Sequence, residues 1–270
     1  MPENRIDATF AKLAATGGKA LMPYVTAGYP NLDVTAELLA QIPSAGASVI
    51  ELGIPYSDPI ADGPVIQESF TRALARGLRI QEVFETVRKV RDKTDAPILS
   101  MVSFSIVYRI GVAAYITQAA DAGFDGLILP DLSLEEAPAI AERTADAGLR
   151  LVMLVAPTSS TDRFEQIARI SQGFVYYIAV AGTTGERDRL PSDLPDNVRR
   201  LRKIGGKPVC VGFGISRPEH VRDVCRVADG AIVGSAIVRR ITAAVDNGAS
   251  DEVIVRQITD FVGDLATGLT

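Results

Sequence analysis

The sequence Ala47-Ser-Val-Ile-Glu-Leu-Gly-Ile-Pro-Tyr-Ser-Asp-Pro-Ile-Ala-Asp-Gly-Pro64 joins a short apolar run to a loop that is rich in acids. The run contains two adjacent β-branched residues, Val49 and Ile50, and predicts a buried strand that ends at Glu51. From Glu51 to Pro64 the chain has three carboxylates and no lysine, arginine or histidine, whereas an ordinary solvated loop mixes charge signs. Three prolines restrict the backbone and reduce the entropy lost in holding one shape. We expect a loop that presents carboxylic acids.

Short apolar runs of the same kind recur along the chain, and each is followed by a stretch with helical spacing. We expect strands at 19–26, 47–50, 97–102, 126–129, 149–155, 174–178, 207–211 and 231–233. The runs are apolar throughout rather than alternating, which is typical of parallel strands covered on both faces. A doubly wound sheet is the competing fold, but it normally has a glycine-rich phosphate turn after its first strand, and Ala27-Gly-Tyr-Pro30 is not one.

The sequence therefore predicts an α/β protein, a single (β/α)₈ TIM-barrel domain over residues 1–270. We also expect an extra N-terminal helix and extra helices after the second and eighth strands. Hydrophobic content of 47% with 23% charged residues is typical of a globular chain. A net charge of −5 argues against binding to nucleic acid or to an anionic membrane.

The location that we expect is the cytoplasm. No apolar run reaches about 18 residues, which is the length of a membrane span. The first residues lack the hydrophobic stretch of a signal peptide. The two cysteines, Cys210 and Cys225, are too few for a disulfide framework or a zinc site, and we expect both in the core.

In a barrel of this kind the loops after the strands form the active site, so Glu51, Asp58 and Asp62 are expected on the functional rim. Gly212-Phe-Gly-Ile-Ser216 follows the seventh strand, and Gly234-Ser-Ala-Ile237 follows the eighth and opens a short helix. Glycines let backbone N–H groups approach an anion, and a helix N-terminus favours negative charge. The two loops together predict a phosphate site, and the alternative is tight turns in a crowded barrel.

Acid–base catalysis by carboxylates is the chemistry that the remaining residues allow. The single histidine, His220, is expected at the surface, and no lysine occupies a strand interior as in a Schiff-base aldolase. The alternatives are a buried, backbone-bonded carboxylate for Glu51 and a turn residue for Asp62. For Asp58, which precedes a proline, turn geometry is the favoured interpretation. The loop after the sixth strand, residues 179–195, is long enough to be a lid or a functionless loop.

The chain resembles the α subunit of tryptophan synthase. The segment from Glu51 to Gln67 matches the most specific motif of that family, and Pro23–Pro30, Gly212–Ser216 and Gly234–Val238 match as well. The resemblance implies a lyase that cleaves indole-3-glycerol phosphate to indole and glyceraldehyde 3-phosphate in a retro-aldol step without metal or organic cofactor.

The resemblance also assigns residues to roles. Glu51 would be the mobile general acid and base, and Asp62 would bind the indole N–H. The residues that would bind phosphate or line the indole slot, or otherwise contact substrate, are Tyr24, Met101, Ile128, Tyr176, Thr184, Gly185, Phe213, Gly214, Gly234 and Ser235.

A β subunit that receives indole and carries pyridoxal phosphate is implied as partner, in an α2β2 heterotetramer. The chain departs from the family at Ser103 and Ser105, where a tyrosine and an asparagine are usual, and at Ala179 and Thr183 in the sixth loop. These departures predict weaker coupling to the partner. A free-standing indole-releasing lyase, a sugar-phosphate isomerase and a silent barrel that activates a partner remain the alternatives.

Overall fold

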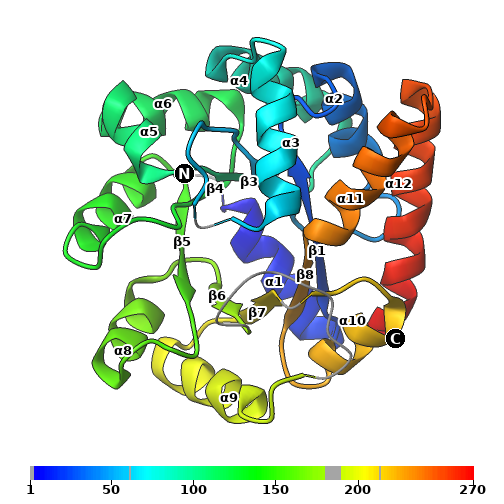
Figure 1. Cartoon of the computed structure of the whole chain (residues 1–270). Coiled ribbons are helices and arrows are strands. Elements are labelled where there is room, and N and C mark those ends of the chain that lie inside the picture. The colour runs from blue at the N-terminus through cyan, green and yellow to red at the C-terminus, as the bar shows by residue number, and fades with distance from the viewer. Residues whose placement is uncertain (1–2, 61, 180–189, 213) are drawn as a thin grey trace.

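The computed structural model describes residues 3–60, 62–179, 190–212 and 214–270. Within them, eight parallel strands pair in chain order and close between β8 and β1, so the predicted barrel is confirmed (Figure 1). The strands are β1 Ala20–Thr26, β2 Ile50–Gly53, β3 Ile98–Met101, β4 Gly126–Ile128, β5 Arg150–Val155, β6 Val175–Ile178, β7 Val209–Gly212 and β8 Gly230–Val233.

Helices surround the barrel (Figure 1), and the apolar residues between helices and strands form one continuous cluster. They are α1 Arg5–Thr16, α2 Leu32–Gln41, α3 Pro64–Ala75, α4 Ile80–Val90, α5 Phe104–Ile110, α6 Val112–Ala122, α7 Ala137–Asp146, α8 Thr161–Ile170, α9 Leu194–Gly205, α10 Pro218–Cys225, α11 Ser235–Asp246 and α12 Asp251–Ala266, with 3₁₀ turns at Arg91–Lys93 and Thr267–Leu269. None of the helices in the described residues is long and apolar enough to cross a membrane.

The core has two layers. An outer cluster fills the space between strands and helices, and an inner cluster fills the barrel itself. The extra helix α1 belongs to the inner cluster through Ile6 and Phe10, and the Phe10 ring lies 5.5 Å from that of Phe174. Asn4 caps α1 by accepting a hydrogen bond from the Ile6 N–H at 2.9 Å. The N-terminal end of the barrel is thus closed, and only the opposite end is left for a site.

Two helices follow β2 and two follow β8, as predicted, but two other details differ. Helix α11 has 12 residues and is not short. Helix α5 was not predicted, because Phe-Ser-Ile-Val-Tyr-Arg-Ile is rich in residues that favour strands. Its start is fixed from a distance: Asp131 accepts from the Phe104 N–H at 2.6 Å.

The prediction that the second strand ends at Glu51 was wrong. Strand β2 begins at Ile50 and continues to Gly53, so Glu51 is its second residue. The reason is pairing on both sides, since Glu51 lies opposite Tyr24 of β1 and opposite Leu99 of β3. A residue held in two ladders has a fixed side-chain direction. The carboxylate of Glu51 is therefore built into the barrel wall rather than carried by a loop.

Candidate active site

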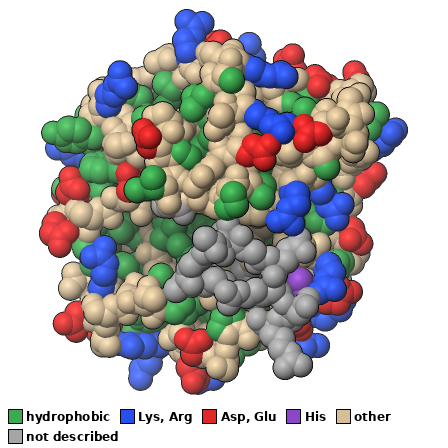
Figure 2. All heavy atoms as spheres, in the orientation of Figure 1, with side chains coloured by type: hydrophobic (Ala, Val, Ile, Leu, Met, Phe, Trp, Pro, Cys, Tyr) green, Lys and Arg blue, Asp and Glu red, His purple; other side chains and the backbone are tan. Residues whose placement is uncertain are grey.

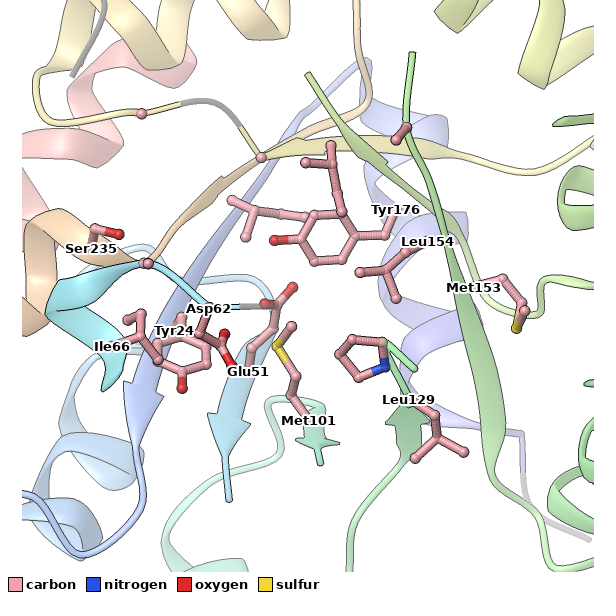
Figure 3. Close-up of a pocket in the computed structure, with 18 of the residues that line it drawn as sticks. Tyr24, Glu51, Asp62, Ile66, Met101, Leu129, Met153, Leu154, Tyr176 and Ser235 are labelled. Carbon is pink, nitrogen blue, oxygen red and sulfur yellow. The ribbon is translucent and has the colours of Figure 1, made fainter. Parts of the chain in front are cut away.

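A cavity of about 840 Å³ opens at the carboxyl ends of the strands. This is the end at which TIM barrels place their active sites. Figure 2 shows a hollow lined by hydrophobic side chains on this face of the molecule. In Figure 3 Ser235 lies at one end of the cavity and Met153 at the other, with Glu51 and Asp62 between them.

Glu51 is the most unusual residue of the cavity wall. Its side chain is 1% exposed, and neither carboxylate oxygen has a hydrogen-bond partner among the described residues. Loss of hydration disfavours the charged form, and burial raises the pKa of Glu51 from 4.5 to about 8. A carboxyl group in this state is protonated at neutral pH and able to donate a proton. The alternative of a carboxylate hydrogen-bonded to backbone does not describe Glu51 in this structure.

Asp62 lines the same cavity from the turn that precedes α3. Burial raises the pKa of its carboxyl group, and a hydrogen bond from the Tyr56 hydroxyl to Oδ2, at 3.4 Å, acts in the opposite direction. Gln67 of α3 braces the turn by donating to the carbonyl oxygens of Asp62 and Pro59, at 2.7 Å and 3.0 Å. The structure thus holds Asp62 in place through residues that the sequence analysis did not single out.

Asp58 lies outside this arrangement. It is exposed and accepts a hydrogen bond from the hydroxyl of its neighbour Ser57 at 2.9 Å. Its carboxylate is part of a surface turn, in agreement with the favoured interpretation. The next apolar residue, Ile60, is 93% exposed at the tip of the same loop.

Two tyrosines line the cavity from strands that are separated by β7 and β8 in the barrel. Tyr24 of β1 and Tyr176 of β6 both lie in its wall, as the resemblance implied. A Cβ atom on Gly53 would collide with the Tyr24 hydroxyl, and one on Gly212 would lie 3.0 Å from the Tyr176 ring. Burial raises the pKa of both phenols, so both stay protonated and serve as hydrogen-bond donors.

The apolar wall is formed by Met101 of β3, Leu129 after β4 and Leu154 of β5. The expectation for Ile128 differs from the structure, which does not place it among the described residues that line the cavity. Ile128 is fully buried in the inner cluster, and Met101, Leu154 and Tyr176 pack against that cluster. Its side chain therefore belongs to the layer on which these lining residues pack.

The polar end of the cavity is lined by Gly214, Gly234 and Ser235. Gly214 has φ of +27°, a conformation that favours glycine, and Gly234 is the N-cap of α11. The N–H groups at the start of α11 and the positive end of its dipole favour an anion there. Arg239 of α11 also lines the cavity, a residue that sequence reasoning missed. Thr184, Gly185 and Phe213, expected as neighbours of this site, lie outside the described residues.

His220 was expected at the surface, and this expectation was wrong. It is buried on α10 below the loop that follows β7. Its Nε2 accepts from Arg217 at 2.9 Å, because a guanidinium group only donates. A polar residue near the start of an amphipathic helix is usually predicted to be exposed. The burial of His220 depends on how α10 packs against the barrel, which the sequence does not show.

Ser103 and Ser105 belong to a network at the edge of the site. The two hydroxyls lie 2.6 Å apart, and Ser103 donates to Asp131 Oδ2 at 2.7 Å. Ser103 is buried and caps α5. Because the hydroxyl of Ser103 already has partners within the chain, it is poorly placed to bond a partner subunit. No group of three potential metal ligands occurs among the residues described.

The fold is a closed (β/α)₈ barrel, and the cavity at the carboxyl ends of its strands contains a buried carboxyl group without a hydrogen-bond partner among the described residues. These features are typical of the class of acid–base enzymes built on this barrel. The model of the family described as tryptophan synthase alpha chain matches residues 10–268. The tryptophan synthase alpha chain of Rhodopirellula baltica is 47% identical over 268 residues, which is 98% of this chain and 96% of the relative. That of Acaryochloris marina is 48% identical over 234 residues, covering 86% of this chain and 88% of the relative.

Solved structures agree. The alpha subunit from Legionella pneumophila is 34% identical, with a TM-score of 0.89 and 98% of each chain covered. A structure of Mycobacterium tuberculosis tryptophan synthase gives 31% identity and a TM-score of 0.88, with 99% of this chain and 98% of the other covered. The chain therefore belongs to the tryptophan synthase alpha chain family, and its role is that of the alpha subunit in tryptophan biosynthesis.

Proposed function

We propose that this chain cleaves indole-3-glycerol phosphate to indole and glyceraldehyde 3-phosphate with Glu51 as the proton donor and acceptor. The observation that carries the proposal is the buried carboxyl group of Glu51 without a partner among the described residues, whose pKa is raised to about 8. A general acid and base is most effective when its pKa lies near the working pH.

The reaction needs two proton transfers at neighbouring atoms. Glu51 donates its proton to ring carbon C3 of the indole, which leaves the positive charge on the ring nitrogen. It then accepts the proton of the hydroxyl group on the adjacent side-chain carbon. The bond between that carbon and C3 breaks, its electron pair returns to the ring, and an aldehyde is released. Glu51 ends the cycle protonated, so one residue serves both steps.

Asp62 has the complementary task. Its carboxylate lies in the same cavity and accepts a hydrogen bond from Tyr56, which favours the ionised form. An ionised Asp62 bonded to the ring N–H stabilises the positive charge that protonation of C3 creates. The two acids thus need opposite protonation states, a division set by the absence of a partner for Glu51 and the presence of one for Asp62.

The phosphate is assigned to the end of the cavity that Gly214, Gly234 and Ser235 line. Replacing Gly214 with valine should raise KM for the phosphorylated substrate and leave the fold intact, because φ of +27° and close approach of an anion both favour glycine. Thermal unfolding serves as the control for folding. An unchanged KM in a folded variant would show that the phosphate binds at another place.

The partner that we propose is a tryptophan synthase β subunit in an α2β2 assembly located in the cytoplasm. The proposed reaction uses this chain's own carboxyl groups, and pyridoxal phosphate is assigned to the β subunit. Ile60 and Tyr108, 93% and 72% exposed, are large apolar side chains near the active-site rim that such a partner could cover.

One assay tests the function and separates the alternatives. Indole release from indole-3-glycerol phosphate is measured for the isolated chain and again with its β subunit at saturation. We expect slow release alone and activation by the partner, which is limited by the partner's preference for the active conformation. Full activity without a partner would support a free-standing lyase, and no activity in either condition would support a silent barrel.

A further inference from the structure

The cavity continues past Glu51 and Asp62 into a second, apolar part. Its far part is lined by Leu132 and Leu134 after β4, Met153 and Ala156 in and after β5, and Ile167 of α8. We refer to these five residues as the side lobe. The whole cavity, about 840 Å³, lies near the upper end of the ~300–1,000 Å³ typical of small-molecule sites.

The side lobe leaves the barrel interior. Met153 and Leu154 are consecutive residues of β5, so their side chains face opposite sides of the strand. Leu154 packs on the inner cluster, whereas Met153 belongs to the outer cluster between strands and helices. Both nevertheless line one cavity, and Figure 3 shows them on opposite sides of the β5 ribbon. The open space therefore bends around β5 towards α8.

The direction of the lobe matches the direction of the substrate. Strand β4 lies across the closed barrel from β8, where the phosphate is assigned. With the phosphate at Ser235 and the reacting carbon at Glu51, the benzo ring of the indole is directed towards Met101, Leu129 and Leu154. The side lobe begins behind these residues, in line with the outer edge of that ring.

The lining of the side lobe is apolar. Its leucine, isoleucine and methionine side chains are buried, and of the described residues at this end of the cavity only Arg163 is charged. An apolar group that contacts the five residues of the side lobe gains burial against apolar side chains, and the polar residues Ser159 and Arg163 also line the cavity.

We propose that the side lobe is a specificity subsite that accepts an apolar substituent on the benzo ring of indole-3-glycerol phosphate. This inference rests on the proposed function and extends it to a class of substrates. Positions 5 and 6 of the ring, farthest from the glycerol chain, are those whose substituents reach the lobe.

The test compares kcat/KM for the parent substrate with that for its 5-bromo and 6-bromo derivatives, using the full chain with its β subunit. We expect at least one bromo derivative to be cleaved within about threefold of the parent. A pocket without spare room discriminates against one extra group by roughly 10-fold or more. Cleavage of the parent with loss of both derivatives at that level overturns the subsite alone. No cleavage of the parent overturns the proposed function and the subsite with it.

Two matched substitutions locate the effect. Ala156→Leu adds bulk inside the side lobe and should lower the ratio of bromo to parent kcat/KM by roughly 10-fold. Ala139→Leu adds the same bulk on the exposed face of α7, outside the lining, and should leave the ratio unchanged. Leu134→Ala enlarges the lobe and should shift the preference towards larger substituents. Equal ratios in all three folded variants would show that the substituent lies elsewhere.

Discussion

Buried carboxylates occur at both ends of this barrel, and their surroundings are opposite. At the N-terminal end Asp125, whose side chain is 4% exposed, accepts from Arg91 at 2.9 Å, from Arg5 at 3.0 Å and from the Ile98 N–H at 2.8 Å. At the C-terminal end Glu51 is equally buried and has no partner among the described residues. Burial alone therefore does not separate the two carboxyl groups, whereas the presence or absence of hydrogen-bond partners does.

The N-terminal arrangement occurs twice. Asp229 lies directly before β8, as Asp125 lies before β4, and it accepts two bonds of 2.7 Å from Arg202 and one of 2.9 Å from the Val209 N–H. Each aspartate thus joins the strand that follows it to the start of the preceding strand, and to an arginine from the helical segment before that preceding strand. A carboxylate with several partners stabilises the fold, whereas a buried one without a partner costs stability, which is the pattern expected of the catalytic role proposed for Glu51.

The largest effect on activity is expected from replacing Glu51, the buried acid without a partner among the described residues. Glu51→Gln keeps the shape of the neutral carboxyl group and removes its proton transfer, so kcat should fall by roughly 10²–10⁴-fold. The free energy of unfolding at neutral pH should rise, because wild type must protonate a carboxyl group that is ionised in the unfolded chain, and glutamine needs no proton. The rate of indole release gives kcat, and urea unfolding gives the free energy of unfolding. A kcat within a few-fold of wild type would make Glu51 a structural residue.

The reverse pattern is expected for the partnered acid. Asp125→Asn leaves Arg91 buried without its counter-charge and should lower the free energy of unfolding by about 3–5 kcal/mol, while kcat per folded molecule is unchanged. Asp229→Asn is the matched control. Its side chain is 28% exposed, so solvent screens the charges and the loss should be smaller. If Asp125→Asn lowered kcat and left urea unfolding unaffected, the comparison between the two ends would fail.

The pH dependence of stability sharpens the same contrast. The folded state raises the pKa of Glu51 from 4.5 to about 8, so the folded chain holds this proton more tightly than the unfolded chain. Its contribution is complete below the unfolded pKa and is lost as pH rises through the folded one, at no more than about 1.4 kcal/mol per pH unit. Between about pH 5 and 8 wild type should lose stability relative to Glu51→Gln. Parallel curves would mean that Glu51 is ionised when folded.

The smallest effect concerns Asp62. Tyr56→Phe removes the 3.4 Å hydrogen bond to its carboxylate, which should raise the pKa of Asp62 further. A bond of this kind contributes about 0.5–1.5 kcal/mol, so the acidic limb of the kcat profile should move to higher pH by at most about one unit. Tyr108→Phe, at an exposed position outside the cavity lining, is the control. If the acidic limb did not move, the hydrogen bond from Tyr56 would have no effect on the pKa of Asp62.

The sequence was sufficient for the barrel because each strand is a local apolar run, and burial on both faces is visible in composition. It was insufficient where a distant contact decides the outcome. Helix α5 depends on a cap from Asp131, 27 residues further along the chain. The end of β2 depends on ladders to β1 and β3, which carried Glu51 from the expected loop into the strand.

For the site, the sequence located Glu51 and Asp62 through an excess of one charge sign in a short segment. It could not show that one acid is bare and the other bonded to Tyr56, because this difference depends on side-chain positions. Ile128 was assigned to the indole slot through the resemblance, whereas in the structure it belongs to the inner cluster on which the lining residues Met101, Leu154 and Tyr176 pack. Arg239 carried no motif beyond its place four residues after Ser235 on α11.

The two tyrosines of the cavity wall share one geometry. Tyr24 pairs with Glu51, and its ring rests on Gly53 two residues further along β2; Tyr176 pairs with Cys210, and its ring rests on Gly212 two residues further along β7. A single added methyl group at either glycine would push a ring towards the bound substrate. A substitution at Gly53 would change the depth of the pocket beside Glu51, and one at Gly212 would change it beside the thiol of Cys210. Evolution could retune substrate size at either position while Glu51 stays in place.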